Sequence, residues 1–389
     1  MTKNTTKSKQ VKINFRCSAT MKYKHIEIQD LNLSVVSTKY WHKLPTGKIQ
    51  CDLCPRNCKL GEGQKGLCYV RERSNDEVVL TTYGRSSGFC IDPIEKKPLN
   101  HFLPGTAILS FGTAGCNLAC KFCQNWDISK SREMDTLSSE ASPEDIASTA
   151  SKLGAKSIAF TYNDPVIFLE YAKDCAIAAK EKNLKSVAVT AGYINPKARE
   201  DFFSFIDAAN VDLKAFTQSF YKKICGGDLS PILETLIYLK KETNVWFEIT
   251  TLLIPGENDS EKEIEEETQW IIDNLGPNVP IHFTSFHPDY KMRDKKNTSL
   301  QALKNARKIA KKNGINHVYT GNIHDEEGSS TYCPNCKNKV IGRDWFKLSN
   351  WELKVSGNCK YCETKIEGLF EDRPGEWGPK RLPVYDIKS

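Results

Sequence analysis

The chain of 389 residues has no long apolar run and no strong excess of one charge. No stretch of about 18 residues is both mostly apolar and free of charged residues, so we expect no membrane-spanning helix. The first residues are polar and rich in lysine, and they lack the apolar core of a secretory signal. The net charge of +7 is small for this length and does not require a nucleic-acid partner. An apolar fraction of 39% beside a charged fraction of 26% excludes disorder as the main state.

Cysteine, by contrast, is abundant, with 15 residues, an odd number that cannot all pair as disulfides. Eleven of them form an N-terminal group, a middle group and a C-terminal group: Cys51, Cys54, Cys58 and Cys68; Cys116, Cys120 and Cys123; and Cys333, Cys336, Cys359 and Cys362. Without a secretory signal, this clustering predicts thiolate ligands of metals in a cytoplasmic protein. Four others, including Cys17 and Cys90, stand alone. Of these, Cys175 lies in an apolar helical stretch and is expected in the core, whereas the glycines after Cys225 are compatible with an exposed thiol.

Composition divides the chain into four segments: residues 1–39, 40–105, 106–322 and 323–389. The first is rich in Lys, Thr and Ser and is expected to be a flexible tail. The second is rich in Cys, Gly and Pro and has few residues for a core, so a metal is expected to hold part of it together. Within it, the Pro- and Lys-rich residues 91–105 predict an ordered loop, and the fourth segment ends in an irregular stretch, residues 372–384.

The third segment alternates between short apolar runs and stretches of helical periodicity. The apolar runs predict buried strands at residues 107–111, 157–162, 186–190, 209–213, 245–253 and 281–286, with a seventh candidate at 317–319. Helix starts with capping residues are predicted at residues 142–144, 164–165, 195–196, 230–231, 259–260 and 298–299. This alternation predicts an α/β fold with a parallel sheet, which suits a full or partial barrel; a doubly wound open sheet is the alternative.

The clearest motif is GTAGCNLACKFCQNW, residues 112–126, which directly follows the first predicted strand. We call these residues the cysteine loop. Loops at the carboxyl ends of parallel barrel strands carry the chemistry of such folds. The spacing Cys-x3-Cys-x2-Cys offers three thiolates, which can hold three irons of a [4Fe–4S] cluster and leave the fourth iron open to a substrate. An incomplete zinc site and reduced structural thiols are the alternatives.

Within this loop, Cys116, Cys120, Phe122 and Cys123 match the CxxxCxΦC motif of the radical S-adenosylmethionine (SAM) superfamily. Further segments resemble the radical SAM enzyme of the AmmeMemoRadiSam system, a branch similar to pyruvate formate-lyase activating enzymes: IDPIEKKPLNHFLPG, FTYNDPVIFLEYA, ANVDLKAF, WFEITTLLIPGENDS, HFTSFHPDYKM and TYCPNC. The resemblance implies a radical SAM partial (β/α)6 TIM-like barrel with a [4Fe–4S] cluster on the three cysteines. It also implies reductive cleavage of SAM to methionine and a 5′-deoxyadenosyl radical, which abstracts hydrogen from a substrate.

The same resemblance implies contacts to SAM beyond the cysteines. Asp164, in the sequence NDP, stands where the superfamily often has an acid that contacts the SAM ammonium, and a helix cap explains it equally well. Asp212 and Lys214 resemble the Asp-x-Lys beside the SAM carboxylate in the activating enzymes, with a simple ion pair as the alternative. His287 resembles a His near SAM in those enzymes, although a lone His is more often structural. Ala191 departs from the Asn expected at its position and puts that part of the pocket in doubt.

The C-terminal cysteine group consists of two Cys-x2-Cys pairs separated by 22 residues. Four thiolates in this arrangement predict a closed, structural zinc site in a zinc-ribbon-like module, with a rubredoxin-like iron site as the alternative. Acidic residues balance the basic ones there and argue against nucleic-acid binding: Glu352, Glu363, Glu367, Glu371 and Asp372. The N-terminal cysteine group is less regular. Zinc, an auxiliary iron–sulfur cluster and no metal are all compatible with its spacing, and zinc or no metal is favoured.

These features give two functional hypotheses. The first is a radical SAM enzyme that acts on a small molecule or a protein glycine. For this hypothesis we expect an electron donor such as a flavodoxin or ferredoxin, and the resemblance implies a system with Memo-like and AMMECR1-like proteins. The second is a zinc-dependent nucleic-acid- or protein-binding module, based on the two flanking cysteine groups and the basic first segment.

Overall fold

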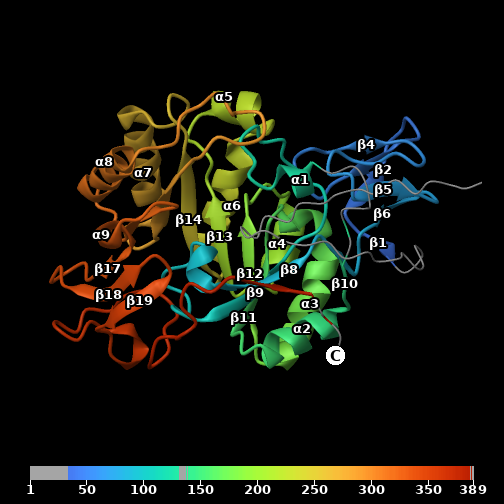
Figure 1. Cartoon of the computed structure of the whole chain (residues 1–389). Coiled ribbons are helices and arrows are strands. Elements are labelled where there is room, and N and C mark those ends of the chain that lie inside the picture. Colours follow the sequence, from blue (N-terminus) through green and yellow to red (C-terminus); the bar gives the residue numbers. More distant parts are fainter. Residues whose placement is uncertain (1–33, 131–136, 138, 386, 388–389) are drawn as a thin grey trace, which may run out of the picture.

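The computed structural model of the protein describes residues 34–130, 137, 139–385 and 387 (Figure 1). Most of the predicted tail, including Cys17, lies outside these residues. Within them, no helix combines the length and the apolar character needed to cross a membrane.

A nine-stranded sheet forms the centre of the described structure. In spatial order its strands are β16 (Val318–Gly321), β15 (Ile281–Ser285), β14 (Trp246–Leu253), β13 (Ala208–Asp212), β12 (Lys185–Thr190), β11 (Ser157–Phe160), β9 (Ala107–Phe111), β8 (Phe89–Pro93) and β20 (Leu382–Val384). From β9 to β16 every neighbouring pair is parallel, whereas β8 and β20 are antiparallel additions at one edge.

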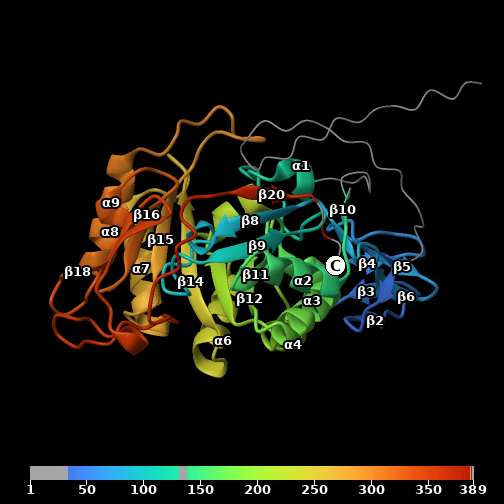
Figure 2. The same ribbon diagram turned by 60° about the horizontal axis from the view of Figure 1, so that its bottom comes forward.

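The seven parallel strands confirm the strands predicted from the apolar runs. They lie in the sheet in chain order, with no reversal of direction along the row. A doubly wound sheet requires such a reversal at its switch point, so that alternative is wrong. Each helical connection therefore leads to the next strand in the same direction along the sheet. Figure 2 shows the main helices on the outer side of the curved sheet.

These helices are α2 (Pro143–Lys152), α3 (Leu169–Glu181), α4 (Pro196–Phe203), α6 (Ser230–Glu242), α7 (Glu261–Leu275) and α8 (Leu300–Lys312). All six start within two residues of a predicted start or, for α3, after a 3-10 turn, but no side chain caps α4 or α6, where the cap positions are Asn195 and Leu229. Ser142 and Asp145 form a reciprocal capping box, and the side chains of Ser260 and Ser299 accept backbone N–H bonds at the starts of α7 and α8. The predicted start at Asp164 opens a short 3-10 turn, η4 (Pro165–Phe168), which leads into α3.

Shorter elements complete the chain. The N-terminal part holds β1 (Val36–Ser37), β2 (Trp41–Lys43), β3 (Ile49–Cys51), β4 (Lys59–Leu60), β5 (Arg71–Ser74), β6 (Glu77–Leu80), β7 (Arg85–Ser86) and the 3-10 turn η2 (Ile94–Lys96). The middle holds α1 (Trp126–Ser129), β10 (Ser139–Glu140), α5 (Gln218–Phe220) and the π-helical turn η5 (Tyr221–Cys225). The C-terminal part holds α9 (Glu326–Ser329), β17 (Thr331–Tyr332), β18 (Lys339–Asp344), β19 (Lys347–Trp351) and η6 (Val355–Gly357).

Three sequence expectations need correction. The predicted tail reached residue 39, but β1 pairs with β6, so its last residues are part of a sheet. The loop predicted from residue 91 begins as the end of β8, which is buried along its whole length against β9. The stretch expected to be irregular ends in β20, an edge strand, where Pro383 is tolerated because an edge leaves one side unpaired. Both flanking segments therefore contribute a strand to the central sheet.

The C-terminal part is anchored to the sheet through buried polar side chains. The guanidinium of Arg343, on β18, donates to the carbonyl of Asn100 at 2.7 Å and lies 3.6 Å from the carboxylate of Glu95. His101 bridges to the same part, since its Nδ1 lies 2.7 Å from the carbonyl of Glu367 and its Nε2 lies 2.6 Å from the Tyr319 hydroxyl. The Pro- and Lys-rich loop after β8 is therefore the connector between sheet and C-terminal module.

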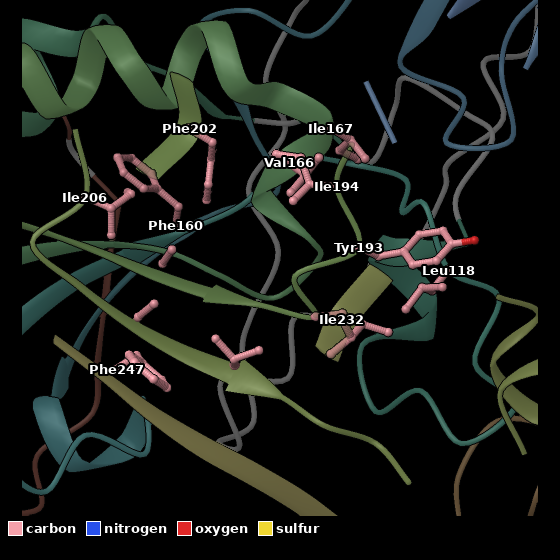
Figure 3. Close-up of a cluster of buried hydrophobic side chains, with 14 of the residues drawn as sticks. Leu118, Phe160, Val166, Ile167, Tyr193, Ile194, Phe202, Ile206, Ile232 and Phe247 are labelled. Atoms are coloured by element: carbon pink, nitrogen blue, oxygen red, sulfur yellow. The ribbon is translucent and has the colours of Figure 1, made fainter. Parts of the chain in front are cut away.

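A continuous apolar core fills the space between the sheet and its helices. Figure 3 shows part of it, in which Phe160, Phe202 and Ile206 pack on one side. Toward the other end of the cluster, Leu118 of the cysteine loop lies beside Tyr193. The core thus extends directly under the loop that carries the middle cysteine group.

Candidate active site

The residues predicted to bind cofactor come together at the carboxyl edge of the parallel strands. The cysteine loop follows β9, Asp164 follows β11, and Asp212 and Lys214 lie at the end of β13. Electrostatic interactions connect them, because the charge of Asp164 acts on Cys116 and the charge of Lys214 acts on both Cys120 and Asp164. Three segments far apart in the sequence therefore share one site.

Two glycines allow the cysteine loop to lie close to neighbouring backbone. A Cβ atom on Gly112 would lie 2.2 Å from the carbonyl oxygen of Thr161, and one on Gly115 would lie 1.9 Å from the carbonyl oxygen of Cys68. Gly115 also has φ of +82°, a left-handed conformation that favours glycine. The loop is thus seated against the end of β11 on one side and against the N-terminal cysteine group on the other.

Asn163 holds the first half of the loop in place. Its side-chain amide nitrogen donates to the carbonyl of Gly115 at 2.9 Å, and its amide oxygen accepts from the N–H of Thr113 at 3.3 Å. On the other side, the side chain of Asn117 donates to the carbonyl of Tyr193 at 2.9 Å, and Arg56 Nε donates to the carbonyl of Asn117 at 2.8 Å. These bonds satisfy backbone groups that a tight loop leaves unpaired.

The second half of the loop pairs with the π-helical turn η5. The N–H of Ala119 donates to the carbonyl of Cys225 at 2.8 Å, and the N–H of Lys121 donates to the carbonyl of Ile224 at 3.0 Å. The Cys225 thiol is fully buried and hydrogen-bonds to Cys120. An exposed Cys225 is therefore wrong, because η5 folds back onto the loop. Cys175, in α3, is buried as predicted.

The three loop thiols are in surroundings suited to metal ligation. Burial raises the pKa of Cys116 to about 11 and raises that of Cys123, whereas the hydrogen bond with Cys225 lowers the pKa of Cys120. The N–H of Leu118 donates to the sulfur of Cys116, two residues back. An N–H two residues ahead also donates to the sulfur of Cys123, whose Sγ lies 3.0 Å from the Ser129 hydroxyl. Such N–H···S bonds favour thiolates once a metal supplies positive charge.

Asp164 is the cap that the sequence offered as one explanation of this residue, and its contact with the SAM ammonium stays a prediction. Its Oδ1 accepts from the N–H of Val166 at 3.2 Å, which caps η4, and from the Thr190 hydroxyl at 2.8 Å. Its Oδ2 accepts from the N–H of Ala191 at 3.1 Å. Burial raises the pKa of this carboxyl, while these hydrogen bonds and the charge of Lys214 act in the opposite direction. Ala191 thus contributes to this network through its backbone N–H.

Asp212 and Lys214 form the ion pair considered as an alternative, with Lys214 Nζ 2.9 Å from Asp212 Oδ2. Burial by itself lowers the pKa of Lys214, but Asp212, Cys120 and Cys225 together hold it well above its usual value. The ammonium also lies 5.9 Å from the ring centre of Phe122, the aromatic residue of the cysteine motif. A protonated lysine is therefore held beside the cysteine loop, where it can accept an anionic partner.

The segment after β15 covers the far end of the cysteine loop. The Trp126 indole N–H donates to Asp289 at 3.1 Å, and its ring stacks on Tyr290 with centres 5.6 Å apart. His287 lies in the same segment and is exposed, so its role near SAM stays a prediction. The sequence did not predict that Asn163 and Cys225 contact the cysteine loop. The position of Asn163 next to Asp164 in the NDP motif is a signal from which its role could have been predicted.

The four cysteines of the C-terminal group form a second candidate metal site. Their sulfur atoms all lie within 4.8 Å of one another, with 3.5 Å between Cys333 and Cys362 and 3.7 Å between Cys336 and Cys359. The site stands at the end of the three-stranded antiparallel sheet of β17, β18 and β19, with a small apolar core of its own.

Comparisons with known proteins agree with this geometry. Residues 111–268, from the end of β9 to α7, match the Radical SAM superfamily. The chain is 38% identical over 330 residues to the uncharacterized protein MJ0808 of Methanocaldococcus jannaschii, a match that covers 84% of this chain and 98% of that protein. The match includes most of the chain that the structure describes.

Solved structures give more distant likenesses. A domain of pyruvate-formate lyase-activating enzyme from Bacteroides vulgatus is 16% identical, with a TM-score of 0.39, and the match covers 43% of this chain and 99% of that one. A radical SAM methyltransferase from Sphaerobacter thermophilus is 14% identical, with a TM-score of 0.43, covering 74% of this chain and 77% of that one. Similarities this low carry no argument about substrate.

The close packing of the cysteine loop against the Cys68 backbone can be tested at Gly115. We expect Gly115→Ala to lower the iron retained after anaerobic reconstitution, because the new Cβ would collide with the Cys68 carbonyl and displace Cys116. Gly154→Ala is the matched control, since Gly154 also has positive φ, +71°, but has nothing within 4 Å of its Cβ position. The control should keep the parent's iron and lose only about 1–2 kcal/mol of stability. Equal iron in both variants would contradict this account of the loop.

Proposed function

Because residues 111–268 match the Radical SAM superfamily, we propose that this chain cleaves SAM reductively at the carboxyl edge of its parallel sheet and uses the radical to abstract hydrogen from a substrate. The observation that carries the proposal is the convergence of three cysteines, one acid and one lysine on that edge. When bound, a [4Fe–4S] cluster and SAM supply the electron transfer and the radical.

The residues present fit that cofactor. Cys116, Cys120 and Cys123 supply three thiolates on one rigid loop, and the set has no fourth cysteine ligand in the motif, which leaves one iron for SAM. Lys214 places a positive charge beside Cys120, which stabilises a thiolate there. Cys120 is buried and Cys116 and Cys123 are half-buried, so the loop also limits the access of water to the radical chemistry.

The amino and carboxylate groups of SAM need partners of opposite charge. We assign the ammonium to Asp164 and the carboxylate to Lys214, the acid and base that interact across the cysteine loop. Asp212 forms an ion pair with Lys214. The Thr190 hydroxyl and the Ala191 N–H donate hydrogen bonds to Asp164. Phe122 and His287 are the remaining proposed contacts, Phe122 beneath the Lys214 ammonium and His287 on the exposed rim.

The finer parts of the proposal rest on the sequence resemblance. We interpret the unreversed parallel sheet as a partial (β/α)6 barrel and the reaction as that of a glycyl-radical-activating-type enzyme in the cytoplasm. A flavodoxin or ferredoxin would supply the electron, and Memo-like and AMMECR1-like proteins would belong to the same system. The alternative hypothesis, a zinc-dependent binding module, gives no role to the cysteine loop or to Asp164 and Lys214 beside it.

We also propose that the C-terminal group binds one zinc ion. Zinc–sulfur bonds of about 2.3 Å place four thiolates in a tetrahedron with edges of about 3.8 Å, close to the measured 3.5 and 3.7 Å. The antiparallel strands around it form a zinc-ribbon-like module. The module lies beside α9, away from α1 at the end of the cysteine loop (Figure 1), which suits a structural role.

The central claim is tested by Cys120→Ala. We expect this variant to lose SAM cleavage, because two thiolates do not hold the cluster with one open iron, while the sheet stays folded. The measurement is 5′-deoxyadenosine formation by the anaerobic protein with dithionite. Cys175→Ala, which removes a buried cysteine away from the loop, is the control and should leave the product yield unchanged. Continued production of 5′-deoxyadenosine by Cys120→Ala would overturn the assignment.

The SAM contacts are tested by Asp164→Ala and Lys214→Ala. Charge-assisted hydrogen bonds contribute roughly 1.5–3 kcal/mol each, and about 1.4 kcal/mol corresponds to one decade in affinity. We therefore expect each variant to bind SAM about ten- to a hundredfold more weakly and to keep the spectrum of its cluster. Asp207→Ala and Lys185→Ala are matched controls, since they break a 2.8 Å ion pair at the opposite end of the sheet. If the site variants bind SAM like the parent, Asp164 is only a helix cap and Lys214 only an ion-pair partner.

The zinc proposal is tested by metal analysis of Cys333→Ser/Cys336→Ser. Removal of two of four thiolates should release about one zinc per chain and lower the stability of the C-terminal module. Iron on the cysteine loop should be unchanged, because the two sites share no ligand. Unchanged zinc would contradict the proposal, and iron in place of zinc in the parent would indicate the rubredoxin-like alternative.

A further inference from the structure

The N-terminal cysteine group is not used by the proposed reaction. Its four cysteines lie on the end of β3, the turn after it, the start of β4 and the turn before β5. A backbone hydrogen bond of 2.9 Å from Cys51 to Cys58 holds two of these pieces together. The Cβ position of Gly66 is 3.5 Å from Cys58 Sγ, so this sulfur faces the turn that leads to Cys68.

The four thiols form one cluster rather than two pairs. Each of the six possible pairs among Cys51, Cys54, Cys58 and Cys68 interacts electrostatically. Cys51 and Cys54 are buried, and the other two are half-buried. Burial raises the pKa of Cys51, Cys54 and Cys68, and a metal bound by the group would convert its thiols to thiolates.

Their local backbone repeats the pattern of the other two cysteine sites. The N–H of Leu53 donates to the sulfur of Cys51, and the N–H of Arg56 donates to that of Cys54. The N–H groups of Val70 and Arg71 donate to the sulfur of Cys68. The same i to i+2 bond is present at Cys116, Cys123, Cys359 and Cys362. Bonds of this kind stabilise thiolates, and they tune the potential of iron–sulfur clusters.

The spread of the sulfur atoms distinguishes one metal ion from a cluster. In the described residues, the C-terminal group brings four sulfurs within 4.8 Å of one another, but no three sulfurs of the N-terminal group meet that limit. A single zinc, with bonds of about 2.3 Å, requires four sulfurs closer than that. A [4Fe–4S] cluster binds each thiolate through a different iron, so its four sulfurs stand further apart.

We propose that Cys51, Cys54, Cys58 and Cys68 hold a second [4Fe–4S] cluster. The spacing in the sequence favours zinc or no metal, whereas the wider spread of the sulfurs in the structure favours a cluster over a single zinc ion. Each iron has a protein thiolate, so this cluster has no open position for SAM. It holds together a segment with few large apolar side chains, directly behind the cysteine loop.

The surroundings of the group support an anionic cluster. The buried guanidinium of Arg71 lowers the pKa of Cys51 and Cys68 against the larger effect of burial. Arg71 is held by Glu170 of α3, with one bond of 3.0 Å and a second to the other carboxylate oxygen of 2.5 Å. Its Nε donates to the carbonyl of Ile167 at 3.0 Å. The segment is thereby fastened to the central sheet domain, and a positive charge lies next to its thiols.

The experiment uses the full chain with Cys116→Ala/Cys120→Ala/Cys123→Ala, reconstituted anaerobically with iron and sulfide. This triple variant cannot hold the SAM cluster, so we expect about four irons and four sulfides per chain from the second cluster alone. Its dithionite-reduced electron paramagnetic resonance signal should not change when SAM is added. The unaltered chain should hold about eight irons, a count that does not depend on how any variant folds.

Two further variants of the triple mutant complete the test. Adding Cys54→Ala/Cys58→Ala should remove the remaining iron, whereas adding Cys175→Ala should leave it in place. A triple variant with no iron, or with a second zinc in its place, would overturn the proposal. A parent chain that holds eight irons but forms no 5′-deoxyadenosine would contradict the proposed reaction. The same result would support the proposal of a second cluster.

Discussion

The carboxyl ends of parallel strands meet at one edge of a sheet, and the candidate site depends on this constraint. The cysteine loop, Asp164 and Lys214 follow different strands, yet they interact electrostatically with one another. The cysteine loop, Asp164 and Lys214 are far apart in the sequence, so no local segment of the chain contains all of them. The pairing of β9, β11, β12 and β13 in chain order brings them together.

The loop itself is held more by backbone than by side-chain packing. Its N–H and carbonyl groups bond to Asn163 and to Ile224 and Cys225 of η5, and the Asn117 side chain donates to the carbonyl of Tyr193. Because these partners belong to other segments of the folded chain, they restrain the loop that carries the three thiols. Preorganised ligands of this kind avoid a loss of conformational entropy on binding.

A positively charged side chain lies near the thiols both at the cysteine loop and at the N-terminal cysteine group. Lys214 and Lys130 act on the thiols of the cysteine loop, and Arg71 acts on those of the N-terminal group. Each cation is itself bonded: Lys214 to Asp212, Lys130 to the carbonyl of Leu118, and Arg71 to Glu170. A buried cation next to buried thiols lowers the cost of forming thiolates where water is excluded. The C-terminal group also has two buried and two half-buried cysteines, but no cation is among the main influences on the pKa values of Cys333, Cys359 and Cys362.

The sequence by itself determined the elements that depend on local pattern: the seven parallel strands, the capped helix starts and the three cysteine groups. Apolar runs, capping residues and ligand spacing act over a few residues, so they can be recognised without the fold. Only the tertiary structure decided that β8 and β20 extend the sheet, because strand pairing across hundreds of residues leaves no local mark. It also decided that Cys225 is buried against Cys120, that Asp164 is both a cap and a neighbour of the cysteines, and how far apart the sulfurs of each group lie. Those properties are distances between segments remote in sequence, and spacing along the chain does not specify them.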